Sequence, residues 1–170
     1  MSLRYVHRIL SGSLISIAGA LAPATASAFN ATLTIPNLCA GPIEVMLFSL
    51  EAMNTLASGS GGGGGAGKAS IKPLVLIKAP DECTPLLFKA VFTGQHFQTA
   101  TLQVGTAKTS LFTIQLQDVV LTDLKHDFAK NGKGAGDDVL VESLTVIGAS
   151  LTFTSGGTSV SCSEATNSCQ

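Results

Sequence analysis

Short runs of alternating apolar and polar residues occur along most of the chain, and this alternation predicts β-strands with one buried face. The clearest run covers residues 111–124, where Phe112, Ile114 and Leu116 alternate with threonine and glutamine. Asp118 interrupts the alternation, which predicts a bulge or the end of the strand. Further strands are expected over residues 31–38, 43–50, 70–78, 100–104 and 139–154.

Two residues modify this list of strands. Pro73 lies within residues 70–78, and a proline donates no hydrogen bond to a sheet, so this strand is expected at an edge or a bulge. Gly148 lies within residues 139–154 and is expected to divide that long segment. The sequence therefore predicts several short strands with irregular joints.

A single short helix is expected, beginning at Thr84 and ending at Gly94. The Thr84 hydroxyl is expected to cap it ahead of Pro85, while Asp81 and Glu82 lie at the positive end of the helix. The apolar stripe of this helix consists of Leu86, Leu87, Val91 and Phe92. Because about ten residues can cover one end of a barrel but cannot form a helical core, the sequence predicts a mainly β fold, a barrel or a sandwich with one short helix.

The first 28 residues have the pattern of a secretory signal peptide. Arg4 and Arg8 form a positive start, an apolar run covers residues 9–21, and Ala26-Ser27-Ala28 supplies a cleavage pattern of small residues. No later apolar run reaches the about 20 residues of a membrane span. We therefore expect an exported protein, periplasmic or extracellular, that has no membrane contact after cleavage. The predicted parts are a signal peptide over 1–28, a β-barrel domain over 29–154 with a glycine-rich loop over 58–67, and a polar C-terminal tail over 155–170.

Composition excludes two classes of protein. Without the leader the chain holds eight lysines and eleven acidic residues, a formal charge of −3, and has no arginine, tryptophan or tyrosine. Arginine dominates the recognition of phosphates and bases, so nucleic acid is not expected as a partner. The whole chain is 45% hydrophobic and 12% charged, which excludes a disordered protein.

All four cysteines follow the leader, at Cys39, Cys83, Cys162 and Cys169. An even number in an exported chain predicts two disulfides, for which three pairings exist. We favour Cys39–Cys83 and Cys162–Cys169, the second closing a small loop in the polar tail. A zinc site would need closely spaced cysteine pairs, which are absent. Free thiols remain the alternative if the compartment is not oxidising.

Two glycine patterns imitate nucleotide-binding motifs. Residues 62–69 approach a P-loop, but Ala69 stands where a serine or threonine would hold magnesium, and a strand is expected to follow where the motif needs a helix. The pattern over residues 59–64 lacks a following helix as well. Neither pattern therefore predicts a cofactor.

Two other segments carry candidate chemistry. Residues 125–138 hold a histidine and three aspartates, but their spacing matches no calcium loop, and Asn131-Gly132 predicts a solvated hairpin turn. His96 follows the helix and is expected to cap its end, because no nucleophile pattern accompanies it. The sequence thus predicts no metal site, no cofactor and no catalytic residue, and we do not expect an enzyme.

The order of short motifs resembles the haemolysin-coregulated protein (Hcp) family, the tube subunit of type VI secretion. The resemblance covers residues 31–154 and begins with a glycine-rich loop, a strand and a Ser/Thr-Pro-Leu helix start. The matching segments are 61–68, 71–78, Thr84-Pro85-Leu86, Gly94-Gln95-His96, Ala100-Thr101-Leu102, 116–121, 142–146 and 151–153.

The resemblance implies a structural role without catalysis. Members of this family form a β-barrel with a flanking helix, six copies close into a homohexameric ring through a heterologous interface, and the rings stack into a tube. The lumen of the tube houses or passes secreted effector proteins. The polar threonine and glutamine face of the strands would line such a channel while the opposite face packs the core.

The glycine-rich loop is a candidate ring-stacking element, because backbone amides can contact a neighbouring ring where no side chain intervenes. Its residues are Gly61, Gly62, Gly63, Gly64, Gly65, Gly67 and Lys68. An inert surface linker is the alternative interpretation of the same residues.

The chain departs from the family pattern in its leader, its cysteines and its tail. Cys39-Ala40-Gly41-Pro42 also stands where the family has a longer polar stretch with Gly-Glu-Ser. These departures favour a second hypothesis, an exported Hcp-like binding module that acts in the periplasm or at the cell surface outside the secretion machine. The first hypothesis predicts rings in solution, and the second predicts a monomer or dimer.

Overall fold

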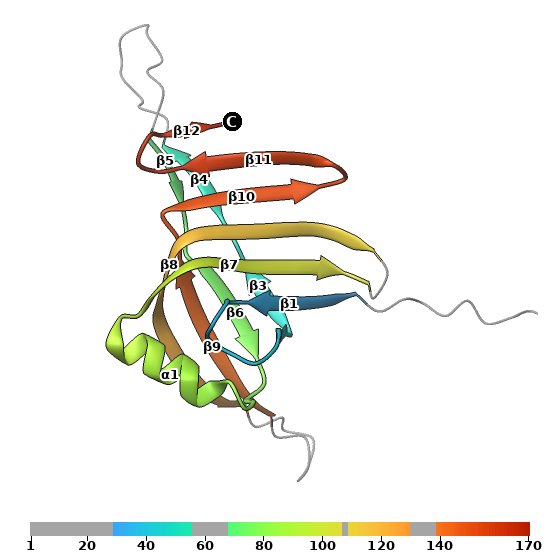
Figure 1. The fold of residues 1–170 in the computed structure, drawn as a ribbon, viewed down its shortest axis with the longest axis vertical. Coiled ribbons are helices and arrows are strands. Elements are labelled where there is room, and N and C mark those ends of the chain that lie inside the picture. Colours follow the sequence, from blue (N-terminus) through green and yellow to red (C-terminus); the bar gives the residue numbers. More distant parts are fainter. Residues whose placement is uncertain (1–28, 56–67, 107–108, 130–138) are drawn as a thin grey trace, which may run out of the picture.

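The computed structural model describes residues 29–55, 68–106, 109–129 and 139–170 (Figure 1). In chain order its elements are β1 (Asn30–Thr34), β2 (Ile43–Val45), β3 (Leu47–Ser49), β4 (Ala52–Thr55), β5 (Lys68–Ile71), β6 (Leu74–Lys78), α1 (Thr84–Thr93), β7 (His96–Gly105), β8 (Ser110–Ala129), β9 (Val139–Ile147), β10 (Ser150–Ser155), β11 (Thr158–Ser163) and β12 (Ser168–Cys169). The expected mainly β fold with one short helix is therefore confirmed.

The long strand β8 organises the main sheet, in which ten strands pair antiparallel. Its first half pairs with β7 on one side and β10 on the other, and β11 and β12 continue beyond β10. Its second half pairs with β9, which pairs with β6, and β6 with β3. β4 and β5 form a separate two-stranded ribbon. One strand thus belongs to both layers that surround the core.

The change of partner occurs at Asp118, where the sequence predicted an interruption. Asp118 has φ of 57°, in the left-handed region. β10 pairs with β8 up to Gln117, and β9 pairs with it from Val120 onward. The link between β9 and β10 passes close to this point at Gly148. A Cβ on Gly148 would lie 2.9 Å from Cβ of Leu116, so only glycine leaves room for the crossing.

The sheet wraps around the core, but its hydrogen-bonded ladder is not closed. One arm runs from β8 through β7 and β1 to β2, and the other runs from β8 through β9 and β6 to β3. The two arms are joined by the chain itself, because Met46 connects β2 to β3. The Met46 N–H donates to the carbonyl of Ile77 on β6 (2.8 Å). The segment from β2 to β3 therefore pairs first with β1 and then with β6, and it connects the two arms covalently where their hydrogen-bonded ladders do not meet.

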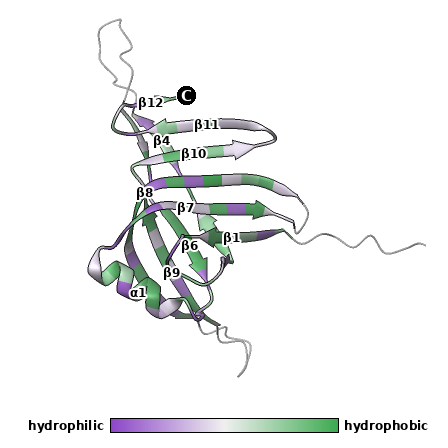
Figure 2. Ribbon diagram, viewed as in Figure 1, coloured by the Kyte–Doolittle hydropathy of each residue, from purple (hydrophilic) through white to green (hydrophobic). Residues whose placement is uncertain are grey.

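The core lies between the two arms and is lined by the alternating apolar positions. Ile114 and Leu116 are buried and Phe112 is half-buried against them, as their alternation predicted. Figure 2 shows the resulting change of hydropathy from residue to residue along β7 and β8. The fully buried aliphatic side chains are Leu33, Leu74, Leu76, Leu87, Leu102, Ile114, Val119, Leu121, Leu144 and Val146. Each buried side chain of this size contributes about 1.5–3 kcal/mol relative to an exposed one.

The helix α1 has the expected length, but its N-terminal cap differs from the prediction. Thr84 is the first helical residue, and its hydroxyl accepts from the Asp81 N–H (3.0 Å) instead of capping the helix. The Asp81 carboxylate accepts from the N–H groups of Cys83 (2.9 Å) and Thr84 (3.2 Å). Cys83 is the N-cap residue and makes no side-chain cap hydrogen bond, so Asp81 orders the turn that leads into α1 and does not cap the helix.

The C-terminal end of α1 follows the prediction at Gly94, which has φ of 60°. The Gly94 N–H donates to Val91, and the Gln95 N–H donates to Ala90 (3.0 Å), the pattern of a Schellman motif. His96 was expected to cap this end. It is instead the first residue of β7, is exposed, and pairs in register with Val120. The backbone of the two preceding residues has already satisfied the helical carbonyls.

The predicted apolar stripe of α1 is half wrong. Leu87 is buried and Val91 packs against the core, but Leu86 and Phe92 face solvent. The buried position that completes the packed face is Ala90. A small residue is needed there because α1 lies directly against β8.

Two strand assignments also need correction. Residues 70–78 do not form one strand, since Pro73 separates β5 of the ribbon from β6 of the main sheet. The polar tail over 155–170, for which no strand was predicted, contains β11 and β12. Serine alternates in β11 with Thr158, Val160 and Cys162, so few apolar residues were present to predict a strand.

Candidate assembly surfaces

The outer face of β1, β7, β8, β10 and β11 is a continuous polar surface whose members carry no ionisable group, and we call it the uncharged polar face. It is bordered by Glu44 on β2, which pairs with Thr32. The strand registers place its members side by side across five strands. They are Thr32 and Thr34 on β1, Thr99, Thr101 and Gln103 on β7, Thr113, Gln115 and Gln117 on β8, Thr152 and Thr154 on β10, and Ser159 and Ser161 on β11. On β1, β7 and β8 their apolar strand neighbours point into or against the core, as the alternation of β-strands requires, whereas Val160 on β11 is exposed.

Hydroxyl pairs order the outer part of the uncharged polar face. The oxygens of Thr152 and Ser161 lie 2.8 Å apart, and those of Thr154 and Ser159 lie 2.9 Å apart. These cross-strand hydrogen bonds satisfy the side chains among themselves. The surface therefore presents hydroxyl and amide groups, with neither ionisable nor large apolar side chains among its members.

A second surface is the solvent side of α1. Phe88 and Phe92 are 57% and 83% exposed, and their rings stack with centroids 6.4 Å apart. Leu86 is exposed on the same helix. Apolar side chains clustered in this way are typical of contact surfaces between proteins.

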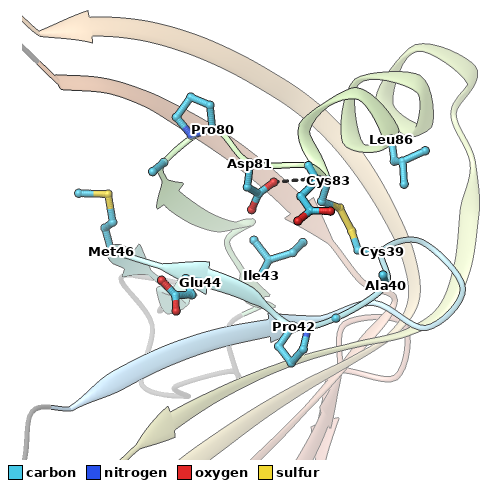
Figure 3. Close-up of a pocket in the computed structure, with 13 residues that line it drawn as sticks. Cys39, Ala40, Pro42, Ile43, Glu44, Met46, Pro80, Asp81, Cys83 and Leu86 are labelled. Carbon is cyan, nitrogen blue, oxygen red and sulfur yellow. Dashed lines mark hydrogen bonds between the residues drawn. A yellow bond between two sulfur atoms is a disulfide. The ribbon is translucent and has the colours of Figure 1, made fainter.

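Two hollows flank Met46, where the sheet changes partners. The larger, about 540 Å³, lies between β2 and the chain that follows β6 (Figure 3). Ile43, Met46 and Leu86 supply apolar lining, and Glu44 and Asp81 supply carboxylates. The smaller, about 220 Å³, lies between the start of β1 and β3, and exposed Phe29 and Leu47 belong to its lining. Both hollows are the openings that an incomplete ladder leaves.

Both favoured disulfides are present, Cys39–Cys83 and Cys162–Cys169. Cys39–Cys83 forms one wall of the larger hollow and ties the turn after β1 to the start of α1 (Figure 3). Cys162–Cys169 joins β11 to β12. Since all four cysteines are oxidised, none of them is a nucleophile or a metal ligand.

A buried ion pair ties together the elements around the start of α1. Lys78 on β6 and Glu142 on β9 are 1% and 0% exposed, and Nζ of Lys78 lies 2.7 Å from Oε2 of Glu142. The Thr84 hydroxyl donates to the same oxygen (2.9 Å). The other oxygen of Glu142, Oε1, lies 3.0 Å from Nε2 of His126 on β8. Four elements thus meet at one carboxylate.

This ion pair was not predicted from the sequence, although the positions of both residues indicated it. Lys78 stands in phase with the buried Leu74 and Leu76, and Glu142 stands in phase with Leu144 and Val146. A lysine and a glutamate at core positions of two strands predict a buried pair when the strands are neighbours. The sequence did not show that β6 and β9 are neighbours in the sheet, because the two strands are far apart along the chain.

The other predicted site residues are only partly described. Gly61, Gly62, Gly63, Gly64, Gly65 and Gly67 lie outside the described residues, as does the predicted turn at Asn131-Gly132. Lys68 begins β5, so the P-loop pattern leads into a strand as expected. In the described part of residues 125–138, a hydrogen bond from Lys125 to Asp127 raises the pKa of Lys125. Over the described ranges no group of histidine, cysteine and acidic residues could hold a metal ion.

None of these surfaces gathers a nucleophile, a base and a substrate cavity among the described residues, and none of the helices described there is long and apolar enough to cross a membrane. The described part of the chain is an incompletely closed β-barrel with exposed polar and apolar surfaces. The sequence pattern of the family described as "Type VI secretion system effector, Hcp" matches residues 38–155, and the chain belongs to this family. Members are structural tube proteins that form homo-oligomeric rings, not enzymes, and they are secreted through the type VI system.

Solved structures show the same fold. A structure described as a type six secretion system protein is 22% identical and has a TM-score of 0.70, with 84% of this chain and 100% of that chain covered. Hcp1 from Salmonella typhimurium is 17% identical over 84% of this chain and 99% of its own, with a TM-score of 0.67. Secreted Hcp3 from Pseudomonas aeruginosa is 18% identical over 79% and 96%, with a TM-score of 0.56. No curated protein sequence matches the chain.

Proposed function

We propose that six copies of this chain close into a ring and that the uncharged polar face lines the channel of the resulting tube. The observation that carries this proposal is the continuity of that face over five strands, from Thr32 on β1 to Ser161 on β11. A channel that passes different effector proteins needs a wet surface that binds none of them strongly. Hydroxyl and amide groups meet this need, because fixed charges or apolar patches would retain cargo.

The proposal includes the route to the working compartment. Residues 1–28 act as a signal peptide, and the chain works in the periplasm or outside the cell. Two disulfides support an oxidising compartment. Residues 61–68 would contact the next ring of the stack, and Lys68 begins β5, which pairs with β4.

Labelling of single cysteines in assembled protein tests the orientation of the face. Gln103→Cys places a thiol on the uncharged polar face, and Lys89→Cys places one on the exposed side of α1. In assembled tubes we expect a small maleimide to label both thiols and a large polyethylene-glycol maleimide to label only Lys89→Cys. Equal labelling of both variants by the large reagent would show that the face does not line the channel.

Native mass spectrometry of the mature protein tests the ring itself. We expect a hexamer at micromolar concentration. A monomer at all concentrations would contradict the ring and support the alternative function, an exported Hcp-like binding module outside the secretion machine. The large hollow beside Cys39–Cys83 is the observation that favours this alternative, since it offers an apolar floor with carboxylates at its rim.

A further inference from the structure

The last strands of the chain lie outside the residues that the family's sequence pattern matches. The match ends at residue 155, the end of β10, whereas β11 and β12 occupy Thr158–Cys169. β11 pairs with β10 along its whole length, from Ser150 with Ser163 to Ser155 with Thr158. Ser161 and Gln170 exchange two backbone hydrogen bonds (2.9 and 2.8 Å), and Cys162–Cys169 fixes β12 to β11. The extension therefore covers the edge of the main sheet that β10 would otherwise present.

The same extension also covers the edge of the β4–β5 ribbon. The Ala69 N–H donates to Oδ1 of Asn167 (2.7 Å), and the Ile71 N–H donates to Oε1 of Glu164. The amides that alternate with these two point the other way, toward β4. The Lys72 N–H, for example, donates to the backbone carbonyl of Glu51 (2.8 Å). Ala69 and Ile71 are thus the outward amides of β5, and both are occupied by side chains of the β11–β12 turn, which lies beside β5 in Figure 1.

The two side-chain acceptors occupy the same backbone N–H groups of β5 that an added strand would use for pairing. Amides two residues apart on one edge point the same way, and a pairing strand would offer them successive carbonyls. Glu164 and Asn167 offer side-chain oxygens instead. The turn between β11 and β12 therefore ends the ribbon without creating a new edge beyond it.

We propose that residues 158–170 form an intramolecular edge cap, which prevents a second copy of this chain from adding its own strand to β10 or to β5. An uncovered strand edge is a template for pairing with another chain. β11 covers all six residues of β10, and β12 covers the end of β11 at Cys162 and Ser163, so residues 158–160 are the part of β11 that stays at the edge. The occupant that it excludes is a second copy, because the rings of this family hold identical chains side by side at high local concentration.

A double variant, Glu164→Ala with Asn167→Ala, tests the part of the cap that covers β5. Thr166→Ala is the matched control, because Thr166 lies in the same turn and its hydroxyl contacts Ser168 (2.8 Å). We expect hydrogen exchange at the amides of Ala69 and Ile71 to be at least about tenfold faster in the double variant and unchanged in the control.

Sedimentation of the same proteins measures the consequence. The double variant should add concentration-dependent species that are larger than those of the control. The proposal is overturned if the two amides keep their protection, or if they become exposed while both variants sediment alike. Because the comparison is between variants, it holds whether or not the starting protein is a ring, so failure of the proposed ring would be recognised separately.

The paired replacement Cys162→Ser with Cys169→Ser loosens the cap without altering any residue that contacts β5. Exchange at Ala69 and Ile71 should again become faster, and larger species should again appear. Wild-type exchange rates and sedimentation in this variant would show that the disulfide has no part in the cap.

Discussion

At the scale of single residues, Lys78 and Glu142 are the polar pair on which four elements of the fold converge. Removing one partner of a buried pair leaves the other charge without compensation, which costs about 3–5 kcal/mol. Lys78→Met is therefore expected to lower the free energy of unfolding by this amount in urea denaturation. Adding Glu142→Leu should restore part of the loss, because two apolar side chains need no partner. An equal or greater loss in the double variant would show that the charges themselves stabilise the fold.

Gly148 supports a second prediction at this scale. A Cβ at this position would lie 2.9 Å from Cβ of Leu116 and 3.0 Å from the carbonyl oxygen of Gln117. Gly148→Ala should therefore lower the free energy of unfolding by about 1–3 kcal/mol. Gly41→Ala is the control, since a Cβ there meets nothing within 4 Å. Equal unfolding midpoints for the two variants would mean that the link between β9 and β10 can shift to make room for the added Cβ without a loss of stability.

At the scale of elements, alternation predicted the strands well and their ends less well. Ile114 and Leu116 are buried as expected, and the interruption at Asp118 is real. The sequence could not show that β8 continues to Ala129, because the strand changes both its phase and its partner after Asp118. The local sequence pattern also could not determine which side of α1 packs against the sheet. For this reason Phe92 was wrongly assigned to the buried stripe of the helix.

The turn at Asp81 that leads into α1 provides the prediction for this scale. Asp81→Ala removes the acceptor for the N–H groups of Cys83 and Thr84 and the contact with Lys78 (3.1 Å). The free energy of unfolding should fall by about 0.5–2 kcal/mol, measured by urea denaturation, because hydrogen bonds to a charged group are lost. Glu82→Ala alters the neighbouring carboxylate and should change stability by less than about 0.5 kcal/mol. A larger loss in Glu82→Ala than in Asp81→Ala would contradict this role of Asp81.

At the scale of the whole molecule, Cys39–Cys83 closes a loop of 44 residues that includes β2 to β6. A cross-link over this separation is expected to contribute about 4 kcal/mol by restricting the unfolded chain, compared with about 2 kcal/mol for the separation of 7 at Cys162–Cys169. Replacing both members of each pair by alanine and comparing unfolding midpoints checks this order. A smaller loss for the longer loop would mean that the unfolded chain is already compact.

The candidate surfaces were predictable to different degrees. The positions of Thr113 and Gln115 predicted a polar side of β8, since alternation determines which residues share each side of a strand. The joining of five such strands into one face depends on register, which only the folded chain shows. The edge cap left no trace in the sequence, because Glu164 and Asn167 meet residues that precede them by 93 and 98 positions.

The passage of the chain from β2 to β3 at Met46 has a mechanical consequence. A cylinder held by continuous ladders can widen only by breaking a row of hydrogen bonds, whereas this one has a covalent bridge, Ile43–Ser49, spanning its gap. Small changes of circumference would be absorbed by rotation about that bridge, with the two adjoining hollows opening or shrinking in compensation. A ring-forming subunit would gain tolerance to bending from such a compliant joint.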